Sequence, residues 1–301
     1  MRTRGYVLFS IAAVLVMLVV TSVPVSGQRG RGGGPPPEPT GPIPRTADGK
    51  PDLRGGFAGT GGGLTHSTIL EEHGAGLGIR AGRSLIIDPA DGVIPYQPWA
   101  LAERDRRRVD VNAYEDPVGH CEFYDIGRLH SFAQRFTYSE GNINIAAQQH
   151  TMRVVHMNRR EHLPDAIRLW QGDSVGWWEG DTLVVETTNF NGKTRMALGG
   201  DFYSANATVV ERFTMIAGNM INWTMTITDP DVFTRPWTME SSAPMVRGGD
   251  ANRATRLVNP AWEHDCHEGN IVLRRMKNLY EQAHGVSPEG EPIGALPTVV
   301  P

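Results

Sequence analysis

Thr208-Val209-Val210-Glu211-Arg212-Phe213-Thr214-Met215 and Met220-Ile221-Asn222-Trp223-Thr224-Met225-Thr226-Ile227-Thr228 are the two segments that decide the fold class of this 301-residue chain. In the second segment apolar side chains alternate with polar ones. Such alternation is typical of an antiparallel strand with one face buried and the other exposed. The four residues between the segments include Gly218 and Asn219, which favour turns. The sequence therefore predicts an antiparallel hairpin over residues 208–228.

Other short segments follow the same pattern at near-regular spacing. The predicted strands are 84–88, 132–138, 142–149, 151–157, 166–170, 175–178, 183–188, 208–215, 220–228, 237–241 and 254–257. Many short strands separated by turns are typical of an antiparallel barrel or sandwich. We therefore predict an all-β, mainly antiparallel fold: a closed or nearly closed barrel or sandwich of about 8–10 strands. One or two peripheral helices are predicted at residues 98–109 and 269–284, from a helix-favouring start after Pro98 and from helical spacing of apolar residues.

The two ends of the chain differ in composition from its middle. Residues 1–27 combine an early positive charge, an apolar run and small residues before Gly27, which predicts a cleaved signal peptide. The alternative is an uncleaved membrane anchor, but the apolar run is about 15 residues, short for a span of roughly 20. Residues 28–50 are rich in Gly, Pro and Arg and predict a disordered linker. A single β-rich domain is expected at 51–284 and a disordered tail at 285–301.

The charge balance excludes some partners. Without Arg2 and Arg4 the chain has 27 basic and 33 acidic residues, a net charge of −6. Nucleic-acid binding needs a basic surface, so nucleic acid is not an expected partner, and neither is a membrane after signal cleavage. The expected location is periplasmic or extracellular. In that oxidising setting Cys121 and Cys266 predict one disulfide, with a catalytic thiol or a metal ligand as the alternative.

Residues 170–186 contain three tryptophans and several carboxylates around a turn at Glu179-Gly180-Asp181. This composition predicts a strand–turn–strand element at one end of the barrel. Aromatic rings beside a cavity would form a wall for a flat or sugar-like ligand. The predicted ligand-binding residues are Trp177, Trp178, Asp181 and Trp223.

The segment Gly172-Asp173-Ser174-Val175-Gly176 matches the Gly-x-Ser-x-Gly pattern of α/β-hydrolases. That motif requires a helix after the serine, whereas here a turn and another strand follow. The segment is therefore interpreted as a Gly-Asp-Ser turn whose side chains bond local backbone amides.

A histidine with carboxylates could provide acid–base chemistry. His162 precedes the strand that leads to Asp173 and Glu179, and a carboxylate that orients an imidazole makes a general base. These three residues are the predicted catalytic group. The alternative is a buried ion-pair network in which Arg159, Arg160 or Arg168 closes a barrel end. Arg212 is expected to pair with an acid, on the opposite side of its strand from Glu211.

No cofactor and no catalytic metal are predicted, because no histidine spacing matches a zinc signature. A metal held by His156 with His162, or by His264 with His267, is left open. His150 and His156 lie roughly 20 Å apart on one strand, which is too far for one ion.

Several motifs occur together along the chain: Asp48-Gly49-Lys50-Pro51-Asp52-Leu53, Gly172-Asp173-Ser174 and Trp178-Glu179-Gly180-Asp181-Thr182-Leu183-Val184-Val185. With them the chain resembles a large family of exported, functionally uncharacterised bacterial proteins. The segment at Asp52–Phe57 is similar to the Gly-x-Trp opening of lipocalin-type barrels, with Phe57 in place of the tryptophan. The resemblance implies export and a barrel, and brings no activity with it.

The sequence thus predicts an exported β-barrel protein that binds a small hydrophobic, aromatic or sugar-like molecule. Two alternatives stay open. One is a cofactor-independent lyase, isomerase or hydrolase that uses a His–carboxylate pair, and the other is a structural or surface-assembly protein. An enzyme would place titratable groups at a cavity, whereas an assembly protein would expose a large apolar patch.

Overall fold

The computed structural model describes residues 38–59, 69–74, 81–108, 114–131, 134–147, 151–241, 243–248 and 271–285. Some predictions concern residues outside these ranges. They are the signal peptide at 1–27, most of the linker, the strand at 254–257, the residues His264, Cys266 and His267, and the tail beyond Gly285. These stay predictions.

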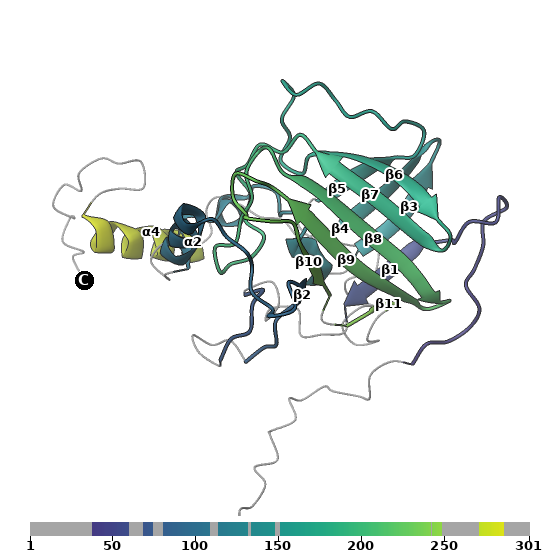
Figure 1. Ribbon diagram of the computed structural model, residues 1–301, viewed down its shortest axis with the longest axis horizontal. Helices are drawn as coiled ribbons and strands as arrows, with labels where there is room; N and C mark the ends of the chain where they lie inside the picture. The colour runs from purple at the N-terminus through teal and green to yellow at the C-terminus, as the bar shows by residue number, and fades with distance from the viewer. Residues whose placement is uncertain are drawn as a thin grey trace, which may run out of the picture. The chain divides into compact units, whose positions relative to one another are not determined.

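Within the described residues, eleven strands form one sheet. They are β1 (Gly55–Gly59), β2 (Ile86–Asp88), β3 (Gln134–Ser139), β4 (Asn142–Ala147), β5 (Met152–His156), β6 (Asp173–Glu179), β7 (Thr182–Thr188), β8 (Thr208–Ala217), β9 (Met220–Thr228), β10 (Trp237–Glu240) and β11 (Met245–Arg247). Nine of them close into a barrel, because β11 pairs with both β9 and β1 (Figure 1). β10 and β2 extend the sheet from β9 outside this ring. The prediction of an all-β barrel is confirmed.

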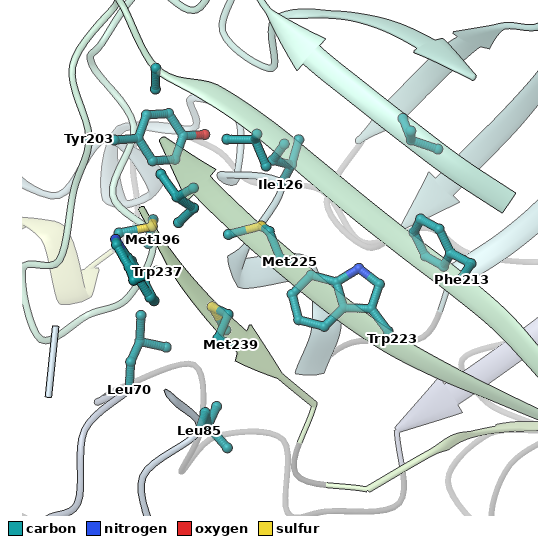
Figure 2. Packing of buried hydrophobic residues seen from close by; sticks show 14 of the residues in the cluster. Leu70, Leu85, Ile126, Met196, Tyr203, Phe213, Trp223, Met225, Trp237 and Met239 are labelled. Carbon is teal, nitrogen blue, oxygen red and sulfur yellow. The ribbon is translucent and has the colours of Figure 1, made fainter. Parts of the chain in front are cut away.

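The alternation read from the sequence sets which side chains enter the barrel. In β8 and β9 buried residues alternate with less buried ones, and the hairpin pairs Phe213 with Trp223. Phe57, Phe136 and Phe213 pack edge to face in the same apolar cluster, where large aromatic rings gain both burial and a favourable geometry. Figure 2 shows Trp223 between Phe213 and Met225 in this cluster. Large side chains therefore occupy the barrel interior.

Two α-helices occur among the described residues, in the two segments where helices were predicted. Helix α2 (Pro98–Arg107) begins at Pro98, whose missing N–H costs nothing in the first turn. Its last turn is basic, which suits the helix dipole. Helix α4 is Ile271–His284, and two short 3₁₀ helices, η2 (Pro117–His120) and η3 (Arg128–Ser131), lie before β3.

In three segments the structure differs from what the local composition suggests. Residues 55–59 include three glycines, a composition typical of loops, yet they form β1 between β3 and β11. Residues 166–170, predicted as a strand, contribute only a single bridge from Leu169 to Phe190. Residues 38–50, placed in the linker by composition, contact the β8–β9 turn, where Asn219 bonds the backbone of Glu38 and Thr40.

One strand pair departs from the predicted antiparallel order. β5 and β6 are parallel and pair over two positions only, Val155 with Ser174 and His156 with Val175. Parallel neighbours need a long connection, and residues 157–172 provide it. Because this segment does not form a strand, it lies as a loop beside the seam between β5 and β6. The candidate site lies at this seam.

Candidate functional site

An open groove of about 1030 Å³ lies at the β5–β6 seam. Its apolar lining is Phe123, Met152, Val154, Leu163, Leu169 and Trp170. Its polar lining includes Arg153, His156, Arg159, Arg160, Glu161, His162, Gln171, Asp173 and Ser174. The groove thus has an apolar part and a charged part.

The strand geometry explains how β5 contributes to the groove. Successive side chains of a strand point to opposite faces. Met152 and Val154 face outward, with 65% and 37% of their surface exposed, whereas Arg153 and Val155 are buried. The apolar wall is therefore the outer face of β5, at the end where β6 no longer pairs with it.

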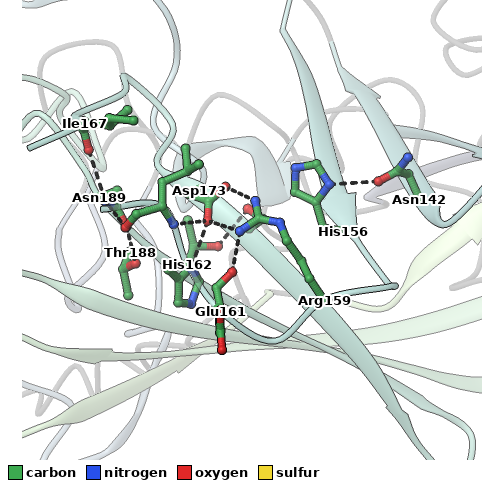
Figure 3. Close-up of polar contacts among 12 residues, drawn as sticks. Asn142, His156, Arg159, Glu161, His162, Ile167, Asp173, Thr188 and Asn189 are labelled. Atoms are coloured by element: carbon green, nitrogen blue, oxygen red, sulfur yellow. Dashed lines mark hydrogen bonds and ion pairs between the residues drawn. The ribbon is translucent and has the colours of Figure 1, made fainter. Parts of the chain in front are cut away.

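Asp173, the first residue of β6, is the centre of the charged part. Arg159 donates to both of its oxygens, from Nη2 to Oδ1 at 2.5 Å and from Nη1 to Oδ2 at 3.1 Å. His162 Nδ1 lies 3.0 Å from Oδ2, and the Leu163 amide donates to the same oxygen at 3.2 Å. Figure 3 shows Arg159 and His162 converging on this carboxylate.

These contacts determine the charge of Asp173. Burial alone raises the pKa of its carboxyl, but the hydrogen bonds from Arg159, His162 and the Leu163 amide outweigh burial and hold that pKa below its usual value. Asp173 therefore anchors the loop 157–172 to β6 as a carboxylate.

The second ring nitrogen of His162 also has a carboxylate partner. Nε2 lies 3.2 Å from Oε1 of Glu186 on β7. The sequence predicted His162 with Asp173, and the structure brings them together, but Glu186 was missed. The hairpin register could have found it, since Asp173 pairs with Thr188 and Glu186 lies two residues away on the same face. With both nitrogens engaged, His162 presents no free nitrogen to the groove.

Asn189, directly after β7, binds the backbone of the loop 157–172. Its Nδ2 donates to the carbonyl oxygens of Leu163, Pro164 and Ile167 at 3.0–3.1 Å, and its Oδ1 accepts from Thr188. Its φ of 60° lies in the left-handed region, which asparagine tolerates better than most residues. The two N–H hydrogens of one buried side chain are thereby shared among three carbonyl groups of the loop.

The structure does not bring Glu179 to His162. Glu179 ends β6, six residues and roughly 20 Å along the strand from Asp173. It accepts from Trp177 Nε1 at 2.8 Å and from Arg212 at 2.7 Å. Arg212 thus pairs with an acid, as predicted, while Glu211 points to the barrel interior.

The predicted ligand-binding residues also lie apart from His162. Asp181 pairs with Arg45 at 2.5 Å, and Trp178 packs partly against the core. Trp177 lies on the outer face, where the Arg160 guanidinium stacks over its ring at 4.5 Å. Trp223 is buried in the barrel. None of these four residues lines the groove.

His156 is the groove histidine whose contacts the sequence did not predict. Its Nδ1 lies 2.9 Å from Oδ1 of Asn142 on β4. Burial and the nearby Arg159 lower the pKa of His156, against a smaller opposing effect of Asp173. His156 and His162 thus have separate partners. Among the residues described by the structure, no group of three or more His, Cys, Asp and Glu side chains could hold a metal ion.

Asp173→Asn tests the anchoring role. We expect it to lower the free energy of unfolding by about 1.5–3 kcal/mol at pH 7, since hydrogen bonds to a charged group have that magnitude. The folded pKa is lower than the unfolded value of about 3.9, so the stabilisation is complete above that value and is lost as pH falls through the folded pKa. Urea denaturation at pH 7 and pH 3 should show the difference from wild type narrowing at pH 3.

Glu179→Gln is the matched control, because Glu179 lies on the same strand as Asp173 and also pairs with an arginine, Arg212 on β8, but is exposed. It should change stability little at either pH. A difference for Asp173→Asn that is the same at both pH values would contradict the anchoring role.

Comparison with known proteins adds no assignment. No family model, no curated protein and no solved structure matches this chain. The resemblance to an exported bacterial family therefore stays a prediction. Among the described helices, none has the length and apolar character needed to cross a bilayer.

Proposed function

We propose that this chain is an exported protein that binds a small molecule with an aromatic or other apolar part in the β5–β6 groove. The observation that carries the proposal is the composition of the groove: six apolar side chains line it together with charged groups, of which Arg159, His162 and Asp173 are paired with one another. Ligand sites are commonly hollows of about 300–1,000 Å³ with an apolar lining and a few oriented polar groups. The volume and the lining of this groove agree with that description.

The apolar wall favours an aromatic ligand. Phe123 and Trp170 lie with ring centroids 6.5 Å apart and both line the groove. Met152 lines the same groove, and because its side chain is flexible and polarisable it can fit an irregular ligand surface. These side chains would be exposed to water without a ligand, and a bound ring would cover them.

Export is the second part of the proposal. It rests on the positive, apolar and small-residue regions of residues 1–27. A Cys121–Cys266 disulfide belongs to the same proposal. Intact-mass measurement of the secreted protein would test both, because cleavage near Gly27 sets the mass and a disulfide blocks alkylation of the two thiols.

The binding proposal is tested with 8-anilinonaphthalene-1-sulfonate, an aromatic anion whose fluorescence rises in an apolar site. We expect wild type to bind the dye at one site. Met152→Glu should weaken binding about tenfold or more, since it places a charge on the apolar wall.

Ile216→Glu is the control variant. Ile216 is an exposed apolar residue on β8 that does not line the groove. Its substitution should leave dye binding unchanged. Equal loss in both variants, or none in Met152→Glu, would refute binding at the groove.

The acid–base alternative predicted for His162 rests on its 3.0 Å contact with Asp173. The Glu186 contact with the other ring nitrogen weighs against it. The arrangement supports His162 as a bridge between β6, β7 and the loop.

A further inference from the structure

We propose that His156 is a general base in the groove, and that it activates a water molecule for hydrolysis of an ester of an apolar or aromatic ligand. The proposal rests on the proposed binding function, because the groove must hold the ligand. It differs from the predicted catalytic group, which did not include His156. Four observations lead to it.

The first observation fixes the tautomer of His156. Asn142 Nδ2 donates to the carbonyl oxygen of Glu140 at 2.9 Å, so Oδ1 is the atom that faces the imidazole. An amide oxygen only accepts, so Nδ1 of the ring carries the proton. In a neutral ring Nε2 is then the atom with the free lone pair.

The second observation concerns access to Nε2. Among the described residues Nε2 has no hydrogen-bond partner, and it is not one of the buried unpartnered side-chain atoms. His156 lines the groove. A water molecule in the groove can therefore reach this nitrogen, in contrast to His162, whose two nitrogens both contact carboxylates.

The third observation is the charge state of the ring. The groups that face His156 from the neighbouring segments are Asn142 on β4, Asp173 on β6 and Arg159 on the loop. Burial and Arg159 together lower the pKa of His156. A neutral imidazole is the form that can accept a proton, and it predominates here at neutral pH.

The fourth observation is a cation on the same face. His156 pairs with Val175, and Trp177 is the next outward residue of β6. Arg160 stacks over Trp177 and lines the groove. Among the described residues Arg160 has no carboxylate partner, in contrast to Arg159. Its guanidinium is thus available for an oxyanion near His156.

The reaction follows from these groups. Nε2 takes a proton from water while the water oxygen forms a bond to the ester carbonyl carbon. The carbonyl oxygen becomes an oxyanion, which Arg160 stabilises. When the tetrahedral intermediate collapses, the C–O bond to the leaving group breaks, and the departing oxygen receives the proton from Nε2. The products are a carboxylic acid and an alcohol or phenol, and His156 returns to its neutral form.

The test uses 4-nitrophenyl butyrate, whose ring fits the aromatic wall and whose product absorbs light. We expect His156→Gln to lower kcat about 100-fold or more, the usual contribution of a general base. His284→Gln, at the end of α4, should retain wild-type activity. The dye-binding measurement is repeated on His156→Gln, so that retained binding with lost hydrolysis separates this proposal from the binding function.

Asn142 is a positioning residue in this scheme. A variant of Asn142 should change the pH dependence of the rate, which a loss of stability alone would not do. Asn142→Asp keeps an acceptor for Nδ1 but adds a charge, which should move the acid limb of the pH–rate profile upward. In wild type that limb should have a midpoint below about 6.5, the ordinary pKa of histidine.

Accessibility of Nε2 is measured without any substrate. Diethyl pyrocarbonate at pH 7 should modify His156 faster than His162, as read by peptide mass spectrometry. Wild-type protein that does not hydrolyse the ester, or His156→Gln with wild-type kcat, would overturn the proposal. Slower modification of His156 than of His162 would overturn the assigned tautomer and access.

Discussion

Arg153→Met is expected to lower the free energy of unfolding by about 3–5 kcal/mol, because it leaves a buried charge without its partner. Arg153 Nη1 lies 2.5 Å from Glu211 Oε2, and both side chains are almost fully buried. Glu211 also raises the pKa of the nearby Asp125, which burial already raises. Without Arg153 the interior would hold these two acids with no neighbouring guanidinium at Glu211. Urea denaturation at pH 7 measures the loss.

The double variant Arg153→Met/Glu211→Gln should recover most of that stability. The ion pair is poorly aligned, since Glu211 Oε2 accepts no hydrogen bond of good geometry and Arg153 Nε has no partner among the described residues. Replacing both charges of a buried pair is often neutral or stabilising. Glutamine retains an acceptor for Trp223 Nε1. A double variant as unstable as Arg153→Met would show that the pair itself, and not the uncompensated charge, sets the cost.

Trp223→Ala is expected to cost about 3–5 kcal/mol, the range for removing a large aromatic side chain from a core. Trp223 is 1% exposed in the apolar cluster, and its Nε1 donates to Glu211 Oε1 at 3.1 Å. The substitution therefore leaves a cavity and removes a donor from a buried carboxylate. Thermal or urea unfolding followed by circular dichroism measures the effect.

Trp177→Ala is the comparison for Trp223→Ala. Trp177 lies on the outer face, where it stacks with Arg160 and bonds Glu179. A cation–π contact at such a site contributes about 0.5–1 kcal/mol, so the loss should be several-fold smaller. Similar losses in the two variants would contradict the placement of Trp223 inside the barrel and Trp177 outside it.

Part of the candidate site could be predicted from sequence order. His162 lies within the loop 157–172 and Asp173 directly follows that loop, eleven residues later, so their contact depends on a short segment. Composition could not show that Glu179 lies far from His162 and Asp173, because carboxylates at the two ends of one strand look equivalent in the sequence. The extended rise of a strand places them far apart.

Other parts of the site depend on pairing between distant segments. His156 meets Asn142 because β4 and β5 are antiparallel neighbours in that register. His162 meets Glu186 because β6 and β7 pair Asp173 with Thr188. A shift of one residue in either register would turn these side chains to the opposite face.

The sequence by itself determined the class of fold and the inward faces of the strands, since alternation of apolar and polar residues is a local property that burial enforces. It also determined the positions of α2 and α4. Only the tertiary structure decided that Gly55–Gly59 closes the ring and that β5 and β6 run parallel. The physical reason is that the neighbours of a strand depend on the backbone pairing of all the strands in the sheet, and not on the strand's own residues alone. The groove exists because residues 157–172 form the connection that a parallel pair requires.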